Sequence, residues 1–234
     1  MILDAFSLEG RTALVTGANR GLGQGLAWAL AEAGADIVTL SRSDPDETIA
    51  RVRDLGRRAH ALRADLAQAT PAELAALVDE AAGRFGRLDI LVNNAGTIRR
   101  QPAAEHSPDD WRDVLKTNLD APFGLAQAAG RHMLGRGSGK IVFIASLLSF
   151  QGGVLVPGYT ASKHAVAGLT KALANEWAGR GVNVNAIAPG YMATDNTAAI
   201  RSDPARRDSI SDRIPAGRWG LPQDLAGAVV FLSS

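Results

Sequence analysis

Short apolar runs alternate along the chain with longer segments in which apolar residues recur every three or four positions. The short runs predict β-strands, and most of them are compactly apolar instead of alternating, as expected for strands buried on both faces of a parallel sheet. The predicted strands are Thr12–Thr16, Ile37–Leu40, Ala59–Ala64, Asp89–Val92, Lys140–Ala145 and Val182–Ile187.

Helical periodicity fills the intervals between these strands, for example over Gln24–Glu32, Ala72–Phe85 and Ala161–Trp177. Thr70, followed by Pro71, provides an N-cap signal before the second of these helices. Strand and helix in repeated alternation indicate βαβ units, so we predict an α/β fold with a doubly wound parallel sheet in one domain, residues 1–234.

The segment Asp195–Trp219 interrupts this alternation, because it is rich in Arg, Asp, Ser and Pro and follows the end of a predicted strand. Ligands of such sheets bind beyond the carboxyl ends of the strands. The segment is therefore predicted to be either a substrate lid or a solvated excursion on the surface.

Composition narrows the class of function. The 234 residues include 25 basic and 24 acidic side chains, and this balance argues against nucleic-acid or membrane-surface binding. The absence of cysteine excludes disulfides and a thiolate nucleophile. With no signal-peptide pattern and no long apolar run, we expect a cytoplasmic protein that acts on a small molecule, without a membrane partner.

A glycine-rich turn, Thr16–Gly23, joins the first strand to the first helix. Such a turn lets the backbone approach a pyrophosphate, and the free N–H groups and dipole of the helix favour its negative charge. The cluster alone could be a tight turn, but its place after the first strand of a βαβ unit favours a dinucleotide site. The candidate residues are Gly17, Asn19, Arg20, Gly21, Leu22 and Gly23.

The end of the second strand bears on the choice of cofactor. A ribose-binding acid expected there for NAD is absent, and the strand instead ends in Ser41 and Arg42. Arg42, with Arg20 in the glycine turn, could pair with the 2′-phosphate of NADP. We therefore favour NADP, while the acids at positions 44 and 46 keep NAD open.

A second group of candidates follows the fifth strand. Tyr159 and Lys163 are four residues apart on a predicted helix and so share one face, and Ser146 closes the strand Lys140–Ala145. A free phenol has a pKa of about 10, and a neighbouring ammonium would favour the phenolate. A surface Tyr and Lys would show the same spacing, but the position after a nucleotide loop and a serine-ended strand favours catalysis.

Together these motifs identify the chain as similar to the short-chain dehydrogenases/reductases over essentially its full length. The resemblance rests on the ordered set Thr16-Gly17-x-x-x-Gly21-x-Gly23, Asp65-Leu66, Asn93-Asn94-Ala95-Gly96, Asn118, Ser146, Tyr159/Lys163 and Pro189-Gly190 with Thr194. It implies a Rossmann-type fold, hydride transfer between a nicotinamide cofactor and an alcohol or ketone, and a homotetramer.

The resemblance also implies individual roles. Asp65 and Leu66 would face the adenine, and Asn93, Ala95 and Gly96 would shape the wall behind the adenosine ribose. Pro189, Gly190 and Thr194 would cradle the carboxamide. Lys163 would bond the nicotinamide ribose, and Asn118 would hold a water that links Lys163 to solvent. No metal is expected, since His60, His106, His132 and His164 lack ligand spacing.

Three further stretches, Ile144–Gly153, Ala188–Thr194 and Arg213–Gly220, are similar to the 2-deoxy-D-gluconate 3-dehydrogenases (2-keto-3-deoxygluconate oxidoreductases) and to the nearby gluconate 5-dehydrogenases. This implies a small anionic sugar-type substrate. Its carboxylate could be clamped by Arg99 and Arg100, with Gln151 and Arg218 as further contacts and Ser146 and Tyr159 at the reacting oxygen. Arg99 and Arg100 could equally be solvated loop charges.

Two features depart from that subgroup. It is mainly associated with NAD, whereas Arg20 and Ser41-Arg42 favour NADP. Members of the family also usually continue beyond Ser234 into a seventh strand that helps to build the tetramer, so we expect either a shortened chain or an exposed sheet edge.

Two alternative functions remain. A 3-oxoacyl-carrier-protein reductase would share the catalytic residues, but its acidic partner needs a basic patch, and the arginines of Asp195–Trp219 are nearly balanced by aspartates. A non-catalytic dinucleotide-sensing protein would be expected to have lost the Tyr or Lys, and both are present here.

Overall fold

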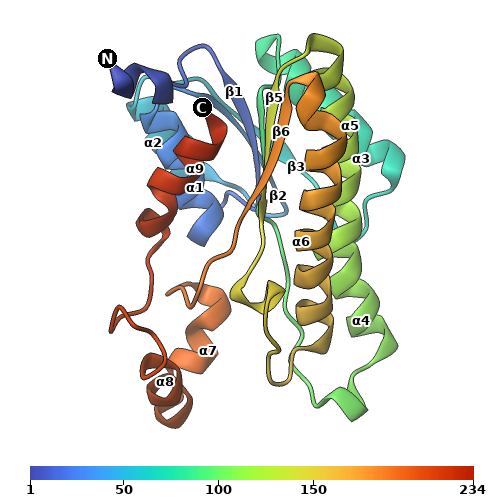
Figure 1. Ribbon diagram of the computed structural model, residues 1–234, viewed down its shortest axis with the longest axis vertical. Coiled ribbons are helices and arrows are strands. Elements are labelled where there is room, and N and C mark those ends of the chain that lie inside the picture. Colours follow the sequence, from blue (N-terminus) through green and yellow to red (C-terminus); the bar gives the residue numbers. More distant parts are fainter.

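A six-stranded parallel sheet forms the centre of the computed structural model, which describes residues 1–234 (Figure 1). The strand order is β3-β2-β1-β4-β5-β6. Because the order reverses between β1 and β4, a crevice opens there at the carboxyl ends of the strands. The predicted doubly wound sheet is confirmed, with β1 (Thr12–Thr16), β2 (Asp36–Ser41), β3 (Ala59–Arg63), β4 (Ile90–Asn93), β5 (Gly139–Ile144) and β6 (Val182–Ile187).

Helices cover both faces of this sheet (Figure 1). One face carries α1 (Gly21–Glu32), α2 (Asp46–Asp54) and α9 (Ala226–Ser233), and the other carries α3 (Pro71–Phe85), α4 (Pro108–Leu115), α5 (Ala121–Arg136) and α6 (Pro157–Trp177). A π-helical turn, Lys116–Asp120, joins α4 to α5. None of the helices is both long and apolar enough to span a membrane.

The predicted start of α3 is confirmed in detail. The Thr70 hydroxyl accepts a hydrogen bond from the Glu73 amide at 3.3 Å, and the Glu73 carboxylate accepts one from the Thr70 amide at 2.8 Å. This reciprocal pair satisfies backbone donors that a helix start leaves free. α1 and α6 begin at Gly21 and Pro157, a few residues before the predicted positions.

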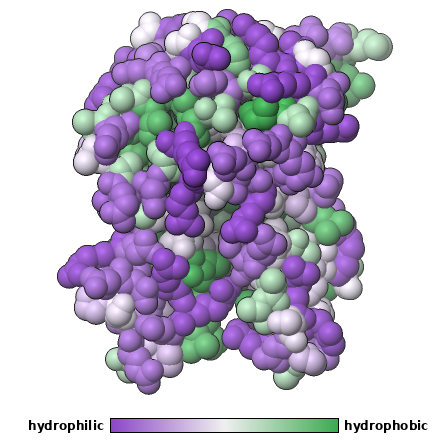
Figure 2. All heavy atoms as spheres, turned by 180° about the vertical axis from the view of Figure 1, so that it is seen from behind, coloured by the Kyte–Doolittle hydropathy of each residue, from purple (hydrophilic) through white to green (hydrophobic).

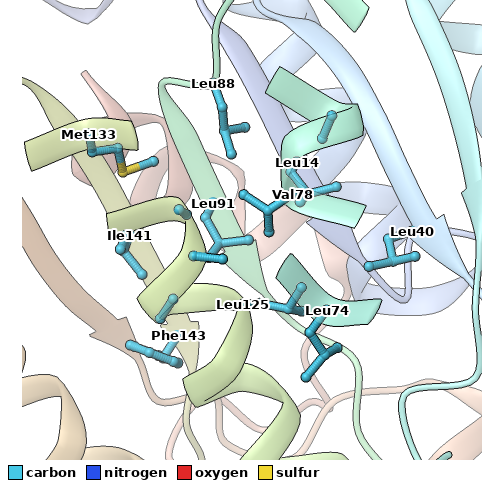
Figure 3. Close-up of a cluster of buried hydrophobic side chains, with 14 of the residues drawn as sticks. Leu14, Leu40, Leu74, Val78, Leu88, Leu91, Leu125, Met133, Ile141 and Phe143 are labelled. Atoms are coloured by element: carbon cyan, nitrogen blue, oxygen red, sulfur yellow. The ribbon is translucent and has the colours of Figure 1, made fainter. Parts of the chain in front are cut away.

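Two apolar cores hold the helices to the sheet. The larger core lies between the sheet and α3, α5 and α6, where Leu91 and Phe143 of the strands meet Val78 and Leu125 of the helices (Figure 3). A second core packs α1 and α9 against the opposite face. All five residues of β1 are buried, so the sheet is a rigid support for the loops at its carboxyl edge.

The segment Asp195–Trp219, which we name the lid segment, lies beyond that carboxyl edge (Figure 1). It contains α7 (Ala198–Arg201) and α8 (Pro204–Ser211). Its two ends are tied together, since the Ala193 amide donates to the Gly220 carbonyl at 2.7 Å and the Gly220 amide donates to the Tyr191 carbonyl at 2.9 Å. The segment is thus a helical excursion on a closed stem, and its role as a substrate lid stays a prediction.

Candidate active site

A cavity of about 340 Å³ opens at the carboxyl ends of the strands, between the start of α1 and the lid segment. In the space-filling view, a hollow with largely hydrophilic surroundings separates two lobes at this end of the molecule (Figure 2). The site residues predicted from the sequence that line the cavity are Gly17, Asn19, Arg20, Gly21, Leu22, Ser41, Arg42, Asp65, Leu66, Ala95, Gly96, Arg99, Tyr159, Lys163 and Thr194.

The glycine turn is packed directly against the end of β4. Gly17 has a positive φ of 65°, and a Cβ at Gly23 would collide with the Gly17 carbonyl and the Asn94 amide. The Asn94 side chain donates to the Thr16 carbonyl at 2.9 Å, and the Thr16 hydroxyl accepts from the amides of Asn94 and Ala95, both at 2.9 Å. Thr16 and Asn94 both belong to motifs quoted in the sequence analysis, but the sequence did not predict the hydrogen bonds between them.

The N-terminus of α1 faces the cavity without a side-chain cap. Arg20 occupies the N-cap position in an extended conformation and makes no capping hydrogen bond. The first N–H groups of this twelve-residue helix therefore remain available to an anion, and the helix dipole adds to their attraction. The Arg20 guanidinium reaches the lid segment instead, where it lies 3.1 Å from the Asp195 carboxylate.

Positive charge marks the end of the cavity near β2 and β3. Arg42 is 76% exposed and lies 3.9 Å from the carboxylate of Asp65. Arg63 pairs with Asp44 at 3.3 Å. Asp44 is one of the two acids near the end of β2 because of which the sequence left NAD open as a cofactor, and this ion pair engages its carboxylate. The Ser41 hydroxyl donates to the Ser43 carbonyl at 2.7 Å. These contacts leave the guanidinium of Arg42 largely exposed at this end of the cavity.

Tyr159 and Lys163 occupy the first two turns of α6, as their spacing predicted. The Lys163 ammonium lies 5.6 Å from the centre of the Tyr159 ring and donates to the Ile144 carbonyl at 2.5 Å. Lys163 is only 5% exposed, and burial lowers its pKa to about 8. A buried ammonium beside a phenol favours the phenolate, which is the form that accepts a proton.

Burial raises the pKa of Tyr159, while hydrogen bonding with the Ser146 side chain and the charge of Arg100 act in the opposite direction. Ser146 is buried two residues after β5, and its hydroxyl accepts from the Leu148 amide at 3.1 Å. The structure thus brings a serine hydroxyl, a phenol and an ammonium together, with the phenol and the ammonium on the cavity wall and the serine beside it. This combination is suited to moving a proton on and off a substrate oxygen.

Asn118 lies behind this group in the π-helical turn. Its side-chain oxygen accepts from the Thr97 amide at 2.8 Å, and its amide donates to the Thr97 carbonyl at 3.0 Å and to the Ser162 hydroxyl at 3.2 Å. The side chain therefore ties the loop after β4 to α6, next to Tyr159. The predicted relay water at Asn118 stays a prediction.

Several predicted residues lie outside the cavity wall. Asn93 is buried at the end of β4 and donates to the Pro122 carbonyl at 3.3 Å. The Pro189 carbonyl accepts from the Leu147 amide at 2.9 Å, next to Ser146. Gly23, Asn118, Ser146, Gly190, Arg100 and Gln151 are also absent from the wall. No three His, Asp or Glu side chains are grouped as metal ligands.

The candidate carboxylate-binding arginines have different surroundings. Arg99 lies 3.2 Å from Asp110 and 2.6 Å from Asp113, so two acids already compensate its charge. Arg100 has no carboxylate partner and donates only to the Asn196 carbonyl at 2.9 Å. Arg218 is held by Asp224 through two bonds of 2.7 and 2.8 Å. Of these three guanidinium groups, only that of Arg100 has an uncompensated charge.

Residues 11–205 match the family described as short chain dehydrogenase. The chain belongs to this family. It is 57% identical over 235 residues to the 2-dehydro-3-deoxy-D-gluconate 5-dehydrogenase of Escherichia coli (strain K12), covering 100% of this chain and 92% of the relative. The predicted family, Rossmann-type fold and NAD(P)-dependent oxidoreductase class are confirmed.

Two solved structures resemble this chain closely. An NADP-bound protein from Agrobacterium tumefaciens, described as a 2-deoxy-D-gluconate 3-dehydrogenase, is 56% identical with a TM-score of 0.91, covering 98% of this chain and 91% of that chain. A gluconate 5-dehydrogenase from Burkholderia cenocepacia J2315, in complex with NADP and tartrate, is 44% identical with a TM-score of 0.93, covering 100% and 92%.

Proposed function

We propose that this enzyme interconverts a secondary alcohol and a ketone on a sugar acid of the 2-dehydro-3-deoxygluconate or gluconate type, with NADP as cofactor. The observation that carries the proposal is the uncompensated charge of Arg100 beside the half-buried Tyr159. The names of the relatives agree with this substrate class, and both solved structures described above contain NADP.

The residues of the cavity wall and their neighbours fit this cofactor. The uncapped N-terminus of α1 would hold the pyrophosphate, and Arg42 would pair with the 2′-phosphate. Asp65 and Leu66 would face the adenine, Lys163 would bond the nicotinamide ribose, and Pro189, Gly190 and Thr194 would lie at the carboxamide. When bound, NADP⁺ supplies the acceptor for the hydride that leaves the alcohol carbon.

The chain's own residues handle the oxygen and its proton. Ser146 holds the substrate hydroxyl by a hydrogen bond, and Tyr159 accepts the proton as the carbonyl forms. Lys163 stabilises the phenolate through its charge. Asn118 holds the water that passes the proton on to solvent. Arg100 binds the carboxylate of the substrate, which places the reacting carbon next to Tyr159.

The two alternative functions have less support. A 3-oxoacyl-carrier-protein reductase needs a basic surface for its acidic partner, and the arginines at 207 and 218 are paired with aspartates within the chain. A non-catalytic dinucleotide sensor would not need Ser146, Tyr159 and Lys163 assembled in one group, with Ser146 and Lys163 buried.

We infer further that the enzyme works as a homotetramer in the cytoplasm. Trp111 of α4 and Phe123 of α5 are large apolar side chains exposed on adjoining helices, which supports an association surface on this side. Light scattering coupled to size-exclusion chromatography tests this directly, and a monomer at working concentrations would contradict it.

The proposed function is tested by a spectrophotometric screen of nicotinamide reduction and oxidation. The panel contains aldonic acids, deoxy-keto aldonic acids, neutral polyols and β-ketoacyl thioesters, each with NADP(H) and NAD(H). We expect the highest kcat/KM for a sugar acid with NADP(H). Higher efficiency with the thioesters or the neutral polyols would contradict the proposal.

A further inference from the structure

Ser149 closes a short 3₁₀ turn, Leu147–Ser149, that begins directly after Ser146. Its side chain is only 5% exposed and lies outside the cavity wall. A hydroxyl removed from water costs free energy unless it is hydrogen-bonded. The partners of this buried hydroxyl therefore identify what it does in the folded protein.

The Ser149 hydroxyl joins the main chains of Ser146 and Lys163. It accepts a hydrogen bond from the Ser146 amide at 3.3 Å and donates one to the Lys163 carbonyl at 2.7 Å. The turn is also closed in the other direction, because the Ser149 amide donates to the Ser146 carbonyl at 2.8 Å. One hydroxyl, which with its two bonds we name the Ser149 bridge, thus ties the segment after β5 to α6.

The bridge holds one end of Lys163, and a second contact holds the other end. The Lys163 ammonium donates to the Ile144 carbonyl at 2.5 Å, while the Lys163 carbonyl accepts from Ser149. Ile144 precedes Ser146 by two residues, and Ser149 follows it by three. Both contacts to Lys163 therefore come from the segment that carries Ser146, one from each side of it.

The same turn orients the side chain of Ser146. The Ser146 hydroxyl accepts from the Leu148 amide at 3.1 Å, and a hydroxyl that accepts in this way can still donate its own proton. The Ser146 side chain is also hydrogen-bonded with Tyr159. A shift of the turn would therefore move the serine hydroxyl relative to the phenol.

We propose that Ser149 is a positioning residue for the reaction, whose hydroxyl sets the place of the Ser146 hydroxyl relative to Tyr159 and Lys163. The inference rests on the proposed function, and Ser149 acts through Ser146 without touching the substrate. A displacement of about 1 Å at a reacting group can lower a rate by about a hundred-fold. A bridge of two hydrogen bonds between the parts that carry the reacting groups limits such displacements.

The test compares Ser149→Ala with the matched control Thr170→Val. Thr170 also lies on α6, and its hydroxyl donates to the Val166 carbonyl at 2.8 Å, away from the proposed reacting groups. Both variants are studied with the best sugar acid from the screen and NADP⁺. The measurements are the rate of hydride transfer in a single turnover, the KM for the acid, the Kd for NADP and the midpoint of thermal unfolding.

We expect hydride transfer in Ser149→Ala to be about ten- to a hundred-fold slower, with the KM and the Kd within about two-fold of the wild-type values. The rate falls because the serine hydroxyl is displaced, whereas the groups that bind the carboxylate and the cofactor stay in place. Thr170→Val should keep the wild-type rate. A wild-type rate in Ser149→Ala, with a change only in thermal unfolding, would overturn the proposal.

A double-mutant cycle separates positioning from a general structural role. Ser149→Ala is combined with Ser146→Ala, and the slow residual turnover is measured at high enzyme concentration. If Ser149 acts through the Ser146 hydroxyl, its removal has no further effect once that hydroxyl is absent. An equal loss of rate in both backgrounds would overturn the bridge and leave the proposed function intact. Ser146→Ala with the wild-type rate would instead contradict the proposed mechanism itself.

Discussion

The Lys163 ammonium donates a hydrogen bond to the carbonyl of Ile144, the last residue of β5, at 2.5 Å. This contact holds the Lys163 ammonium of α6 against the carboxyl edge of the sheet. Ile144 lies only two residues before Ser146 in the sequence. It compensates only part of the cost of burial, since the pKa of Lys163 is lowered to about 8. The buried ammonium therefore contributes to the active site but lowers the stability of the folded protein.

The cost of burying Lys163 can be measured through its pH dependence. The ordinary pKa of 10.5 applies to the unfolded chain, so the unfolded state binds more protons between about pH 8 and 10.5. The penalty is on the order of 3 kcal/mol below pH 8 and falls to zero as the pH rises through this window. The wild type therefore gains stability from about pH 8 to 10.5.

Lys163→Met should remove this dependence. We expect the variant to be inactive but more stable than the wild type below pH 8, with a difference that shrinks at higher pH. Chemical denaturation at several pH values measures this difference in the free energy of unfolding. A difference that does not change with pH would show that the ammonium is not destabilised by burial.

Arg42 should set the preference for NADP. Arg42→Ala removes the cation at the ribose end of the cavity, where its present partner, Asp65, is 3.9 Å away. Loss of a charge-assisted phosphate contact corresponds to a decrease of about ten- to a hundred-fold in kcat/KM with NADP. The efficiency with NAD, which lacks the phosphate, serves as the internal control and should stay the same. An unchanged ratio of the two efficiencies would remove Arg42 from the phosphate site.

The close packing of the glycine turn predicts a strong effect of a single methyl group. Gly23→Ala places a Cβ against the Gly17 carbonyl and the Asn94 side chain, which forces the turn and the end of β4 apart. We expect a loss of about 1–3 kcal/mol in the free energy of unfolding and a weaker affinity for NADP.

The matched control is Gly168→Ala. Gly168 lies in α6, and a Cβ there would meet no atom within 4 Å. An alanine inside a helix stabilises it by about 0.5–1 kcal/mol relative to glycine, so this variant should gain stability and keep its affinity for NADP. Similar results for both variants would contradict the packing argument.

Much of the sheet could be predicted from the sequence because its signals are local. A compact apolar run such as Thr12–Thr16 predicts a strand that is buried on both faces of the sheet. The hydrogen bonds between Thr70 and Glu73 join residues only three apart in the sequence, so they depend on no distant part of the chain. Helix α5 (Ala121–Arg136) was missed among the predicted examples. It is rich in Ala and Gly and buried on several sides, which blurs helical periodicity.

The polar part of the site was less predictable, because charge compensation depends on residues that only the fold brings together. Arg99 and Arg100 are neighbours in sequence, yet Arg99 is paired with Asp110 and Asp113 of α4 while Arg100 contacts the lid segment. No pattern near position 99 indicates which of the two charges remains uncompensated.

The most direct measurement concerns Tyr159. Replacement by Phe keeps the ring against Lys163 and removes only the hydroxyl that exchanges the proton. We expect kcat/KM with the best sugar acid to fall by about 10²- to 10⁴-fold, while the Kd for NADP, measured by fluorescence titration, stays within about two-fold of the wild-type value. A Tyr159→Phe variant that turns over the sugar acid as fast as the wild type would contradict the proposed mechanism.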